Sequence, residues 1–135
     1  MYRRNLFVCQ GNIDRSKAGE LIYSQMLKEA GFKVEDFFSI RDADFYVGSA
    51  GIQVSAEAEF NGSVQLDWRM IEAADRVFSI DESITLVLVK DFSARRERTV
   101  QLDIPDGRSL LIPEQAESLF REFREKLRGY VPHRL

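Results

Sequence analysis

The sequence has one cysteine and one histidine, and these low numbers exclude two kinds of site. A single cysteine cannot form an intramolecular disulfide, which fits a reducing cytoplasm and leaves the thiol free. The histidine, His133, lies near the carboxyl terminus. A zinc site built from cysteines and histidines is therefore excluded, and we expect neither a metal nor another cofactor.

Long hydrophobic runs and an excess of one charge are also missing. The longest apolar runs, such as residues 86–89, are far shorter than the about 20 residues that cross a bilayer. The basic amino terminus is followed by too short an apolar stretch to form a signal peptide. A formal net charge of -3 gives no reason to expect nucleic acid or an anionic membrane as a partner. We therefore expect a cytoplasmic protein, while its oligomeric state stays open.

Repeats, low-complexity segments and linkers rich in proline, glycine or serine are absent as well. The chain has 135 residues, of which 44% are hydrophobic and 30% charged. These values are those of an ordinary globular domain that is long enough to bury a core. The sequence predicts a single domain over residues 1–135.

What is present is an alternation of short apolar runs and amphipathic segments. The apolar runs predict strands over residues 6–9, 45–47, 76–80 and 99–102. The amphipathic segments predict helices over residues 17–30, 64–74, 82–90 and from 113 onward. Strands that alternate with helices form parallel sheets with right-handed crossovers. We therefore predict an α/β fold, a single three-layer domain in which a four-stranded parallel sheet has helices on both faces.

Two helix starts carry recognisable residues. Asp81 precedes the third helix, where its carboxylate can cap the free amides. Pro113 stands at the first position of the last helix, where proline is favoured. Along that helix four apolar residues are expected to face the core: Leu119, Phe120, Phe123 and Leu127.

The residues between the first strand and the first helix are suited to binding a phosphate. Ligands of parallel sheets bind beyond the carboxyl ends of the strands, which is where Cys9 lies. A loop there can point its amides and a helix N-terminus at an oxyanion, and Arg15 can bind two of its oxygens. Gly11 and Asn12 tolerate the positive φ angles of a tight loop. The same positive field favours the thiolate of Cys9, to which Ser16 could donate a hydrogen bond.

These residues resemble a known family. The segment 6–16, Leu-Phe-Val-Cys-Gln-Gly-Asn-Ile-Asp-Arg-Ser, looks like the signature of low-molecular-weight protein tyrosine phosphatases and related arsenate reductases. Segments 47–51 and 74–81 are similar to that family's second and third strand segments, and 102–106 to its general-acid loop. The segment 102–106 looks closer still to that of a branch of small bacterial and archaeal predicted tyrosine phosphatases.

The resemblance implies a phosphatase that works through a phosphocysteine, on a phosphorylated protein or a small aryl phosphate. Cys9 would attack phosphorus, and Asp106 would be the general acid, with Asp103 as the reserve candidate. Arg15 would bind the phosphate, and Ser16 would support the thiolate. The phosphate-binding residues would be Gln10, Gly11, Asn12, Ile13, Asp14 and Arg15.

The sequence departs from the family pattern at three positions. Lys17 stands where proline is usual, and Gly107 follows Asp106 where an aromatic residue is usual. The carboxylate of Asp14 would oppose an anion if it pointed inward, so we expect it to point outward and bond to amides. Phe60 could supply the aromatic wall against a phenyl ring instead, whereas Trp68 is expected to pack on a helix face.

Other functions stay open at this point. A non-catalytic phosphate- or phosphoprotein-binding module could keep the loop without efficient turnover. An arsenate reductase would need an external thiol, because no second cysteine is available. A cysteine-phosphorylated sugar-transport domain shares the loop position but gives no reason for Arg15 at this spacing.

Overall fold

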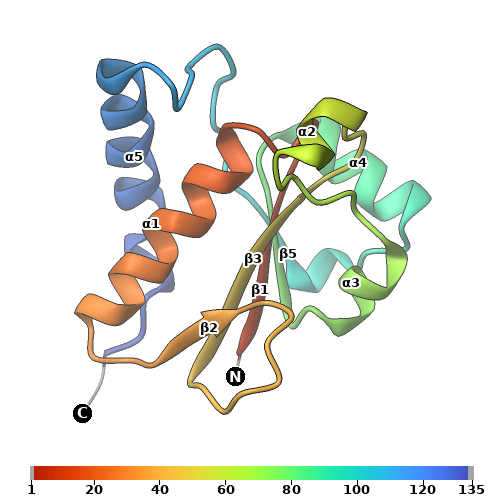
Figure 1. The fold of residues 1–135 in the computed structure, drawn as a ribbon. Helices are drawn as coiled ribbons and strands as arrows, with labels where there is room; N and C mark the ends of the chain where they lie inside the picture. Colours follow the sequence, from red (N-terminus) through yellow and green to blue (C-terminus); the bar gives the residue numbers. More distant parts are fainter. Residues whose placement is uncertain (1, 134–135) are drawn as a thin grey trace.

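The centre of the molecule is a sheet of five parallel strands (Figure 1). The computed structural model describes residues 2–133. The strands are β1 (Arg4–Cys9), β2 (Val34–Asp36), β3 (Phe45–Gly51), β4 (Arg76–Ser79) and β5 (Thr99–Gln101). Their order is β2-β3-β1-β4-β5, and every neighbouring pair is parallel. The α/β class is thereby confirmed, with β1 at the middle of the sheet.

The prediction of four strands is wrong, because it lacked the edge strand β2. This strand has three residues, Val34, Glu35 and Asp36, and pairs with β3 from Val34 opposite Phe45. Two of its three side chains are acidic, so it has no apolar run to reveal it. Its place is set by backbone pairing at the sheet edge.

The helices are α1 (Arg15–Glu29), α2 (Ala56–Phe60), α3 (Trp68–Ala73), α4 (Glu82–Asp91) and α5 (Pro113–Leu127), with 3-10 turns η1 (Arg96–Arg98) and η2 (Arg128–Tyr130). The helix predicted over residues 64–74 begins only at Trp68. Asp67 caps it by accepting a hydrogen bond from the Arg69 N–H at 2.8 Å. Ahead of it, Gln65 pairs with Gly51 as a short parallel extension of the sheet. The short helix α2 was not predicted.

Helices cover both faces of the sheet, which confirms the three layers. The helices α1 and α5 pack on one face, and α3 and α4 on the other (Figure 1). Alternate residues of β1 serve the two cores: Phe7 and Cys9 face the α1–α5 side, while Leu6 and Val8 face α3 and α4. The side chain of Cys9 therefore projects to the side on which α1 starts.

A close contact and two predicted features shape the helices. A Cβ on Gly19 would lie 2.5 Å from the Phe7 ring, so this glycine lets α1 approach the sheet. Asp81 caps α4 as predicted, by accepting a hydrogen bond from the Ile84 N–H at 3.0 Å. On α5 three of the four predicted core residues are fully buried, and Phe120 is only partly covered.

In the described part of the chain no helix has the length and apolar character to cross a membrane.

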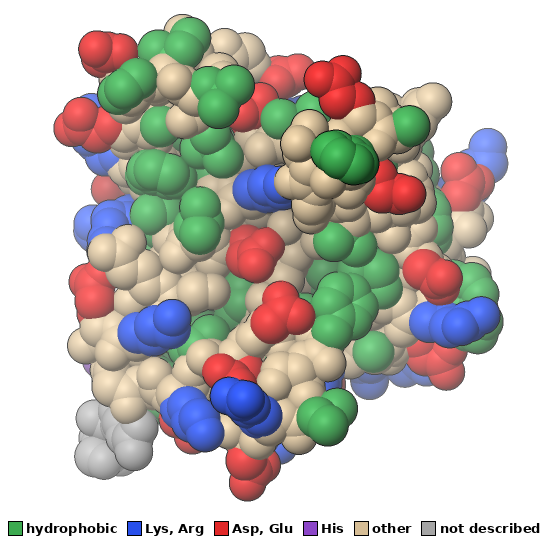
Figure 2. Space-filling model, in the orientation of Figure 1, with side chains coloured by type: hydrophobic (Ala, Val, Ile, Leu, Met, Phe, Trp, Pro, Cys, Tyr) green, Lys and Arg blue, Asp and Glu red, His purple; other side chains and the backbone are tan. Residues whose placement is uncertain are grey.

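The surface seen from the side of α1 carries both signs of charge. Acidic and basic side chains are interspersed over it, and no broad area of one sign is visible (Figure 2). A long polyanion would find no continuous basic stripe on this face.

Candidate active site

The segment between β1 and α1, residues 9–16, is called the phosphate loop below. Its strand ends at Cys9 and its helix begins at Arg15, so it lies at the carboxyl edge of the sheet. Gly51, at the end of β3, packs directly against the backbone of this loop. A Cβ on Gly51 would lie 2.7 Å from the Asn12 nitrogen and 2.8 Å from the Gly11 carbonyl carbon. Only glycine allows the loop to pack this closely on the sheet.

Asn12 fixes the shape of the phosphate loop. It is fully buried and has a φ of 52°, in the left-handed region. Its side-chain amide donates to Ser16 Oγ at 2.7 Å. Its side-chain oxygen accepts from the Val64 N–H at 2.8 Å, and its carbonyl accepts from the Ser63 hydroxyl at 2.7 Å. Gly11, by contrast, has no positive φ, so that part of the prediction is wrong.

The thiol of Cys9 lies at the bottom of the loop and is almost fully buried, with 4% of the residue exposed. Its sulfur donates to Ser16 Oγ at 2.9 Å and accepts from the Asn12 N–H at 3.3 Å. When the thiol ionises, the Ser16 hydroxyl can turn its hydrogen to the sulfur. Two donors then stabilise the thiolate, and both are held by the loop itself.

Most amides of the phosphate loop point to no protein acceptor. Within residues 2–133, six loop N–H groups have no hydrogen-bond acceptor: those of Gln10, Gly11, Ile13, Asp14, Arg15 and Ser16. They precede or open α1, whose dipole adds positive potential at this end. Free donors at a helix N-terminus are the arrangement that binds a tetrahedral oxyanion.

Arg15 is held in place by contacts from two other strand ends. Its side chain is 10% exposed. Its Nη1 donates to Asp81 Oδ2 and to the Ile104 carbonyl oxygen, both at 2.9 Å. Its Nε lies 3.8 Å from Asp106 Oδ1. The guanidinium is therefore fixed at the loop, with donors left for a ligand.

Asp81 is the partner of Arg15 that sequence reasoning missed, because it was interpreted only as a helix cap. Burial raises the pKa of its carboxyl group, but hydrogen bonds from Ser83, Ile84 and Arg15, together with the Arg15 charge, outweigh burial and hold the pKa below its usual value. Asp81 thus carries a negative charge beside the guanidinium. Its position just after β4, at the same sheet edge as Cys9, was the clue available in the sequence.

The two candidate acids occupy different places. Asp106 is 85% exposed at its side chain and lies beside Arg15. Asp103 has a φ of 55°, and its carboxylate accepts a hydrogen bond from Gln101 at 2.7 Å, back toward β5. The Asp103 carbonyl accepts from Lys126 on α5. Of the two, Asp106 is the carboxylate that faces the phosphate loop.

The carboxylate of Asp14 is turned outward, as expected. Its Oδ1 accepts a hydrogen bond from the Leu110 N–H at 2.9 Å. It gives α1 no side-chain cap. Asp14 therefore ties the phosphate loop to the segment that follows Asp106, and its charge is engaged away from the loop interior.

Large apolar side chains are exposed on segments around the sheet edge. Ile13 is 54% exposed on the phosphate loop itself, Phe60 90% at the end of α2, and Leu111 91% in the segment before α5. Trp68 is 58% exposed, so the prediction that it packs on the helix face is wrong. Ile13 and Phe60 are available to an apolar group of a ligand.

Comparison with known proteins gives likenesses in structure alone. No protein-family model and no curated protein sequence matches the chain. Wzb of Vibrio vulnificus, solved with benzylphosphonate, aligns with a TM-score of 0.69 at 20% identity, over 96% of this chain and 97% of that one. A low-molecular-weight protein tyrosine phosphatase of Bacillus subtilis gives 0.65 at 22% identity, over 93% and 97%.

A third solved structure is the arginine phosphatase YwlE, in a variant with a phosphorylated active-site serine. YwlE comes from Bacillus subtilis. It aligns with a TM-score of 0.61 at 19% identity, over 92% of this chain and 95% of that one. These alignments run nearly from end to end of both chains. The chain therefore has the fold of the low-molecular-weight protein tyrosine phosphatases, in agreement with the resemblance of its phosphate loop.

Proposed function

We propose that this protein is a cysteine-dependent phosphomonoester hydrolase that acts on phosphotyrosine or a similar aryl phosphate. One observation carries the proposal: the Cys9 sulfur, the fixed Arg15 guanidinium and six free amides belong to one loop at a helix N-terminus. This set combines a nucleophile with donors for the oxygens of a phosphate. The enzyme would be a single domain in a reducing compartment such as the cytoplasm, where the thiol stays reduced.

In the first step the Cys9 thiolate attacks phosphorus. The S–P bond forms while the bond from phosphorus to the leaving oxygen breaks. The loop amides and Arg15 stabilise the charge on the equatorial oxygens. Asp106, protonated at the start, gives its proton to the leaving oxygen, so that an alcohol or phenol departs.

In the second step water attacks the phosphocysteine. Asp106, now a carboxylate, takes a proton from the water, and the P–S bond breaks. Inorganic phosphate and the Cys9 thiolate are the products, and Asp106 again holds its proton. Ser16 and the Asn12 N–H support the thiolate as leaving group, as they do in the resting enzyme. No metal is needed for either step.

An aryl phosphate is the substrate class that the surroundings support. Ile13 presents an exposed apolar side chain at the loop, and Phe60 offers an aromatic face on α2. A phenyl ring is the right shape to pack against such groups. The Vibrio vulnificus relative in fold was solved with benzylphosphonate, a phenyl-bearing phosphonate.

One of the two observations that favoured a non-catalytic phosphate-binding module no longer does so. It rested on Asp14, whose charge would weaken anion binding, and on the missing aromatic residue after Asp106. Asp14 is engaged with the Leu110 N–H, away from the loop interior. The proposed aromatic role of Phe60 would replace the missing residue.

Hydrolysis of p-nitrophenyl phosphate tests the proposal directly. Wild-type protein should release nitrophenol without added metal and in the presence of EDTA, and vanadate should inhibit it. The Cys9→Ser variant should lose the activity but still bind phosphate. Phosphotyrosine peptides should be better substrates than phosphoserine peptides or phosphoarginine. Wild-type protein that binds phosphate with no turnover would favour the non-catalytic module, and preference for phosphoarginine would overturn the aryl assignment.

A further inference from the structure

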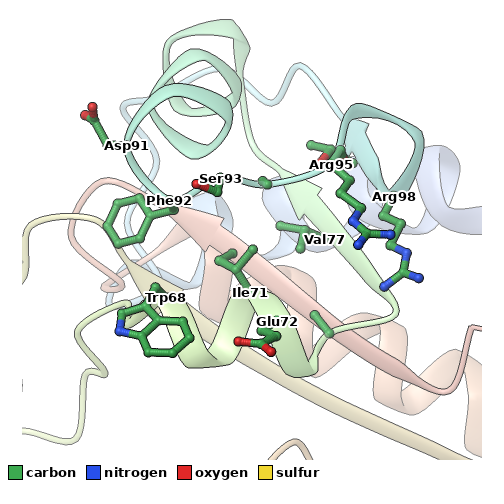
Figure 3. Close-up of a pocket in the computed structure, with 12 residues that line it drawn as sticks. Trp68, Ile71, Glu72, Val77, Asp91, Phe92, Ser93, Arg95 and Arg98 are labelled. Carbon is green, nitrogen blue, oxygen red and sulfur yellow. Dashed lines mark hydrogen bonds between the residues drawn. The ribbon is translucent and has the colours of Figure 1, made fainter.

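A cavity of about 420 Å³ lies on the face of the sheet that α3 and α4 cover, opposite α1 and α5 (Figure 3). Its floor is apolar and comes from Ile71 on α3 and Val77 on β4. Trp68 and Phe92 lie on one side of this floor, and Arg95 and Arg98 on the other (Figure 3). The volume is in the range of cavities that hold small organic ligands.

This cavity is separate from the phosphate loop. Its arginine side precedes β5, and Ala74, another lining residue, precedes β4. These are the amino ends of the strands, whereas Cys9 ends β1 at the opposite edge. None of the residues assigned above to the reaction lines the cavity. A ligand here would not compete directly with a phosphate at Cys9.

The apolar side is open to a ligand. Trp68 is 58% exposed although it is large and aromatic, and Ile71 and Phe92 are only partly covered. An exposed indole beside partly covered aliphatic and aromatic groups offers a surface on which a flat apolar body can stack.

The arginine side offers positive charge that the protein does not use. Among residues 2–133, four arginine side chains have no ion pair, hydrogen bond or aromatic partner: Arg41, Arg95, Arg96 and Arg98. Three of these four lie together at η1, and two of those three line the cavity. A planar guanidinium without a partner is a donor fork for a carboxylate, phosphate or sulfonate.

The acidic residues nearby set the orientation of a ligand. Asp91 points away from the cavity, and the Glu72 carboxylate is turned toward the Trp68 side (Figure 3). Glu97 belongs to η1 but does not line the cavity. On the Trp68 side, the Arg69 guanidinium lies over the ring but already has Asp67 as an ion-pair partner. An anionic group is therefore favoured at Arg95 and Arg98, which have no such partner.

We propose that this cavity is a second binding site, which takes an amphiphilic organic anion. The flat apolar body of the ligand stacks on Trp68 above Ile71, and its anionic group is bound by Arg95 and Arg98. Apolar surface supplies the affinity, and the arginine pair selects for charge. The proposal does not depend on the reaction at Cys9.

The single tryptophan makes the test direct, because Trp68 is the only intrinsic indole reporter in the chain. The probe is 8-anilinonaphthalene-1-sulfonate, which has a flat apolar body and one anionic group. Titrating it into the protein should quench the Trp68 emission in a saturable way by energy transfer. The neutral analogue N-phenyl-1-naphthylamine, which lacks the sulfonate, should bind about tenfold more weakly.

Matched variants separate the arginine pair from net charge. Arg95→Gln with Arg98→Gln should weaken binding of the sulfonate by about tenfold and leave binding of the neutral analogue unchanged. Arg41→Gln with Arg96→Gln makes the same change in net charge at arginines that do not line the cavity. This control pair should change the affinity less than twofold. Saturating vanadate, which occupies the phosphate loop, should leave the titration unchanged.

Three results would overturn the proposal. The first is equal weakening by the two double variants, which would assign the effect to net charge. The second is equal affinity for the charged and neutral probes. The third is loss of the Trp68 signal change when vanadate is bound, which would place the probe at the phosphate loop.

Discussion

The phosphate loop and the segment that carries the candidate acid differ in how firmly they are held. This segment, residues 103–112, is called the acid loop. In the phosphate loop the side chains of Cys9, Asn12 and Ser16 are buried and bonded to one another. In the acid loop Asp106 is 85% exposed, and among residues 2–133 its carboxylate accepts a hydrogen bond only from its neighbour, the Gly107 N–H.

The difference separates two tasks. Stabilising charge in a transition state needs donors that are fixed before the substrate arrives. Transferring a proton needs one carboxylate that reaches the leaving oxygen, and an exposed loop can supply this once the substrate is bound. Two hydrogen bonds join the acid loop to the phosphate loop: Arg15 donates to the Ile104 carbonyl, and the Leu110 N–H donates to Asp14.

Among variants that test this comparison of the two loops, the largest loss of activity is expected when the candidate acid, Asp106, is replaced. Asp106→Asn should lower kcat/KM for a substrate with a poor leaving group, such as phenyl phosphate, by about 10²–10⁴-fold. For p-nitrophenyl phosphate the loss should be much smaller, because its leaving group needs little protonation. Steady-state rates over a series of substituted phenyl phosphates measure this dependence.

Asp103→Asn is the matched control for Asp106, since it makes the same chemical change in the same loop. Asp103 bonds to Gln101 and lies toward β5. Its variant should keep the leaving-group dependence of the wild type. The opposite pattern, with the dependence altered only in Asp103→Asn, would move the acid role to Asp103.

A smaller loss is expected when the support of Arg15 is weakened. Asp81→Asn keeps an oxygen that can cap α4 but removes the charge that faces the guanidinium. Arg15 would then lie less accurately, and we expect kcat/KM to fall by about 10²-fold with little loss of thermal stability. Phosphate should also inhibit this variant less strongly.

Ser83→Ala serves as the control for Asp81, because Ser83 bonds to the other carboxylate oxygen. It should leave kcat/KM within about twofold of the wild type. If both variants lost activity equally, the cap of α4 rather than the charge beside Arg15 would explain the result.

A still smaller effect should follow from releasing one tether of the acid loop. Asp14→Ala removes the acceptor of the Leu110 N–H, whereas Asp14→Asn keeps an acceptor oxygen. The alanine variant should lower kcat/KM for poor leaving groups by about two- to tenfold, and the asparagine variant should stay near the wild type. If neutralising the carboxylate in Asp14→Asn strengthened phosphate binding strongly, Asp14 would be opposing the ligand.

The smallest effect concerns a residue outside both loops. Burial raises the pKa of Glu20 above its usual value, with the Ser49 hydrogen bond and Lys17 acting against it and Asp36 with it. A raised pKa in the folded state favours the protonated form, so the stability that Glu20 adds is present in acid and is lost as the pH rises through this pKa. Glu20→Gln, which keeps an acceptor for the Ser49 hydroxyl, should raise Tm at neutral pH by about 1–3 °C.

Thermal unfolding at several pH values tests the sign of this effect. The advantage of Glu20→Gln should shrink as the pH is lowered below the ordinary range of glutamate, where both proteins carry an uncharged side chain. An advantage that grew in acid would contradict the raised pKa. Activity at neutral pH should be unchanged in either case.

Features with a local cause could be predicted from the sequence. The apolar run that ends at Cys9 and the amphipathic segment after it define the strand, the loop and the helix. The cap formed by Asp81 is local for the same reason. The outward orientation of the Asp14 carboxylate could be predicted because an inward carboxylate would repel a bound anion.

Features that depend on distant partners could not be predicted. The edge strand β2 has no apolar run and is defined by its pairing with β3 and by the packing of Val34 on the core. The helix α2 was missed for another reason: its five residues are too few to show an apolar period, although Ser55 caps it. The ion pair between Asp81 and Arg15 joins residues 66 positions apart, which no periodicity reveals. The positive φ falls on Asn12 rather than on Gly11, because the side chain of Asn12 bonds on both sides of the turn.

The most direct test of the account is to trap the phosphoryl group on the enzyme. The Asp106→Asn variant, mixed rapidly with p-nitrophenyl phosphate and quenched in acid, should accumulate the covalent intermediate. The nitrophenolate can leave in the first step with little help from an acid, whereas the second step lacks its base. Mass spectrometry of the digested protein should then find one added phosphoryl group on the peptide that contains Cys9. Continued turnover with no phosphoryl group on Cys9, or with the group on another residue, would contradict the central claim.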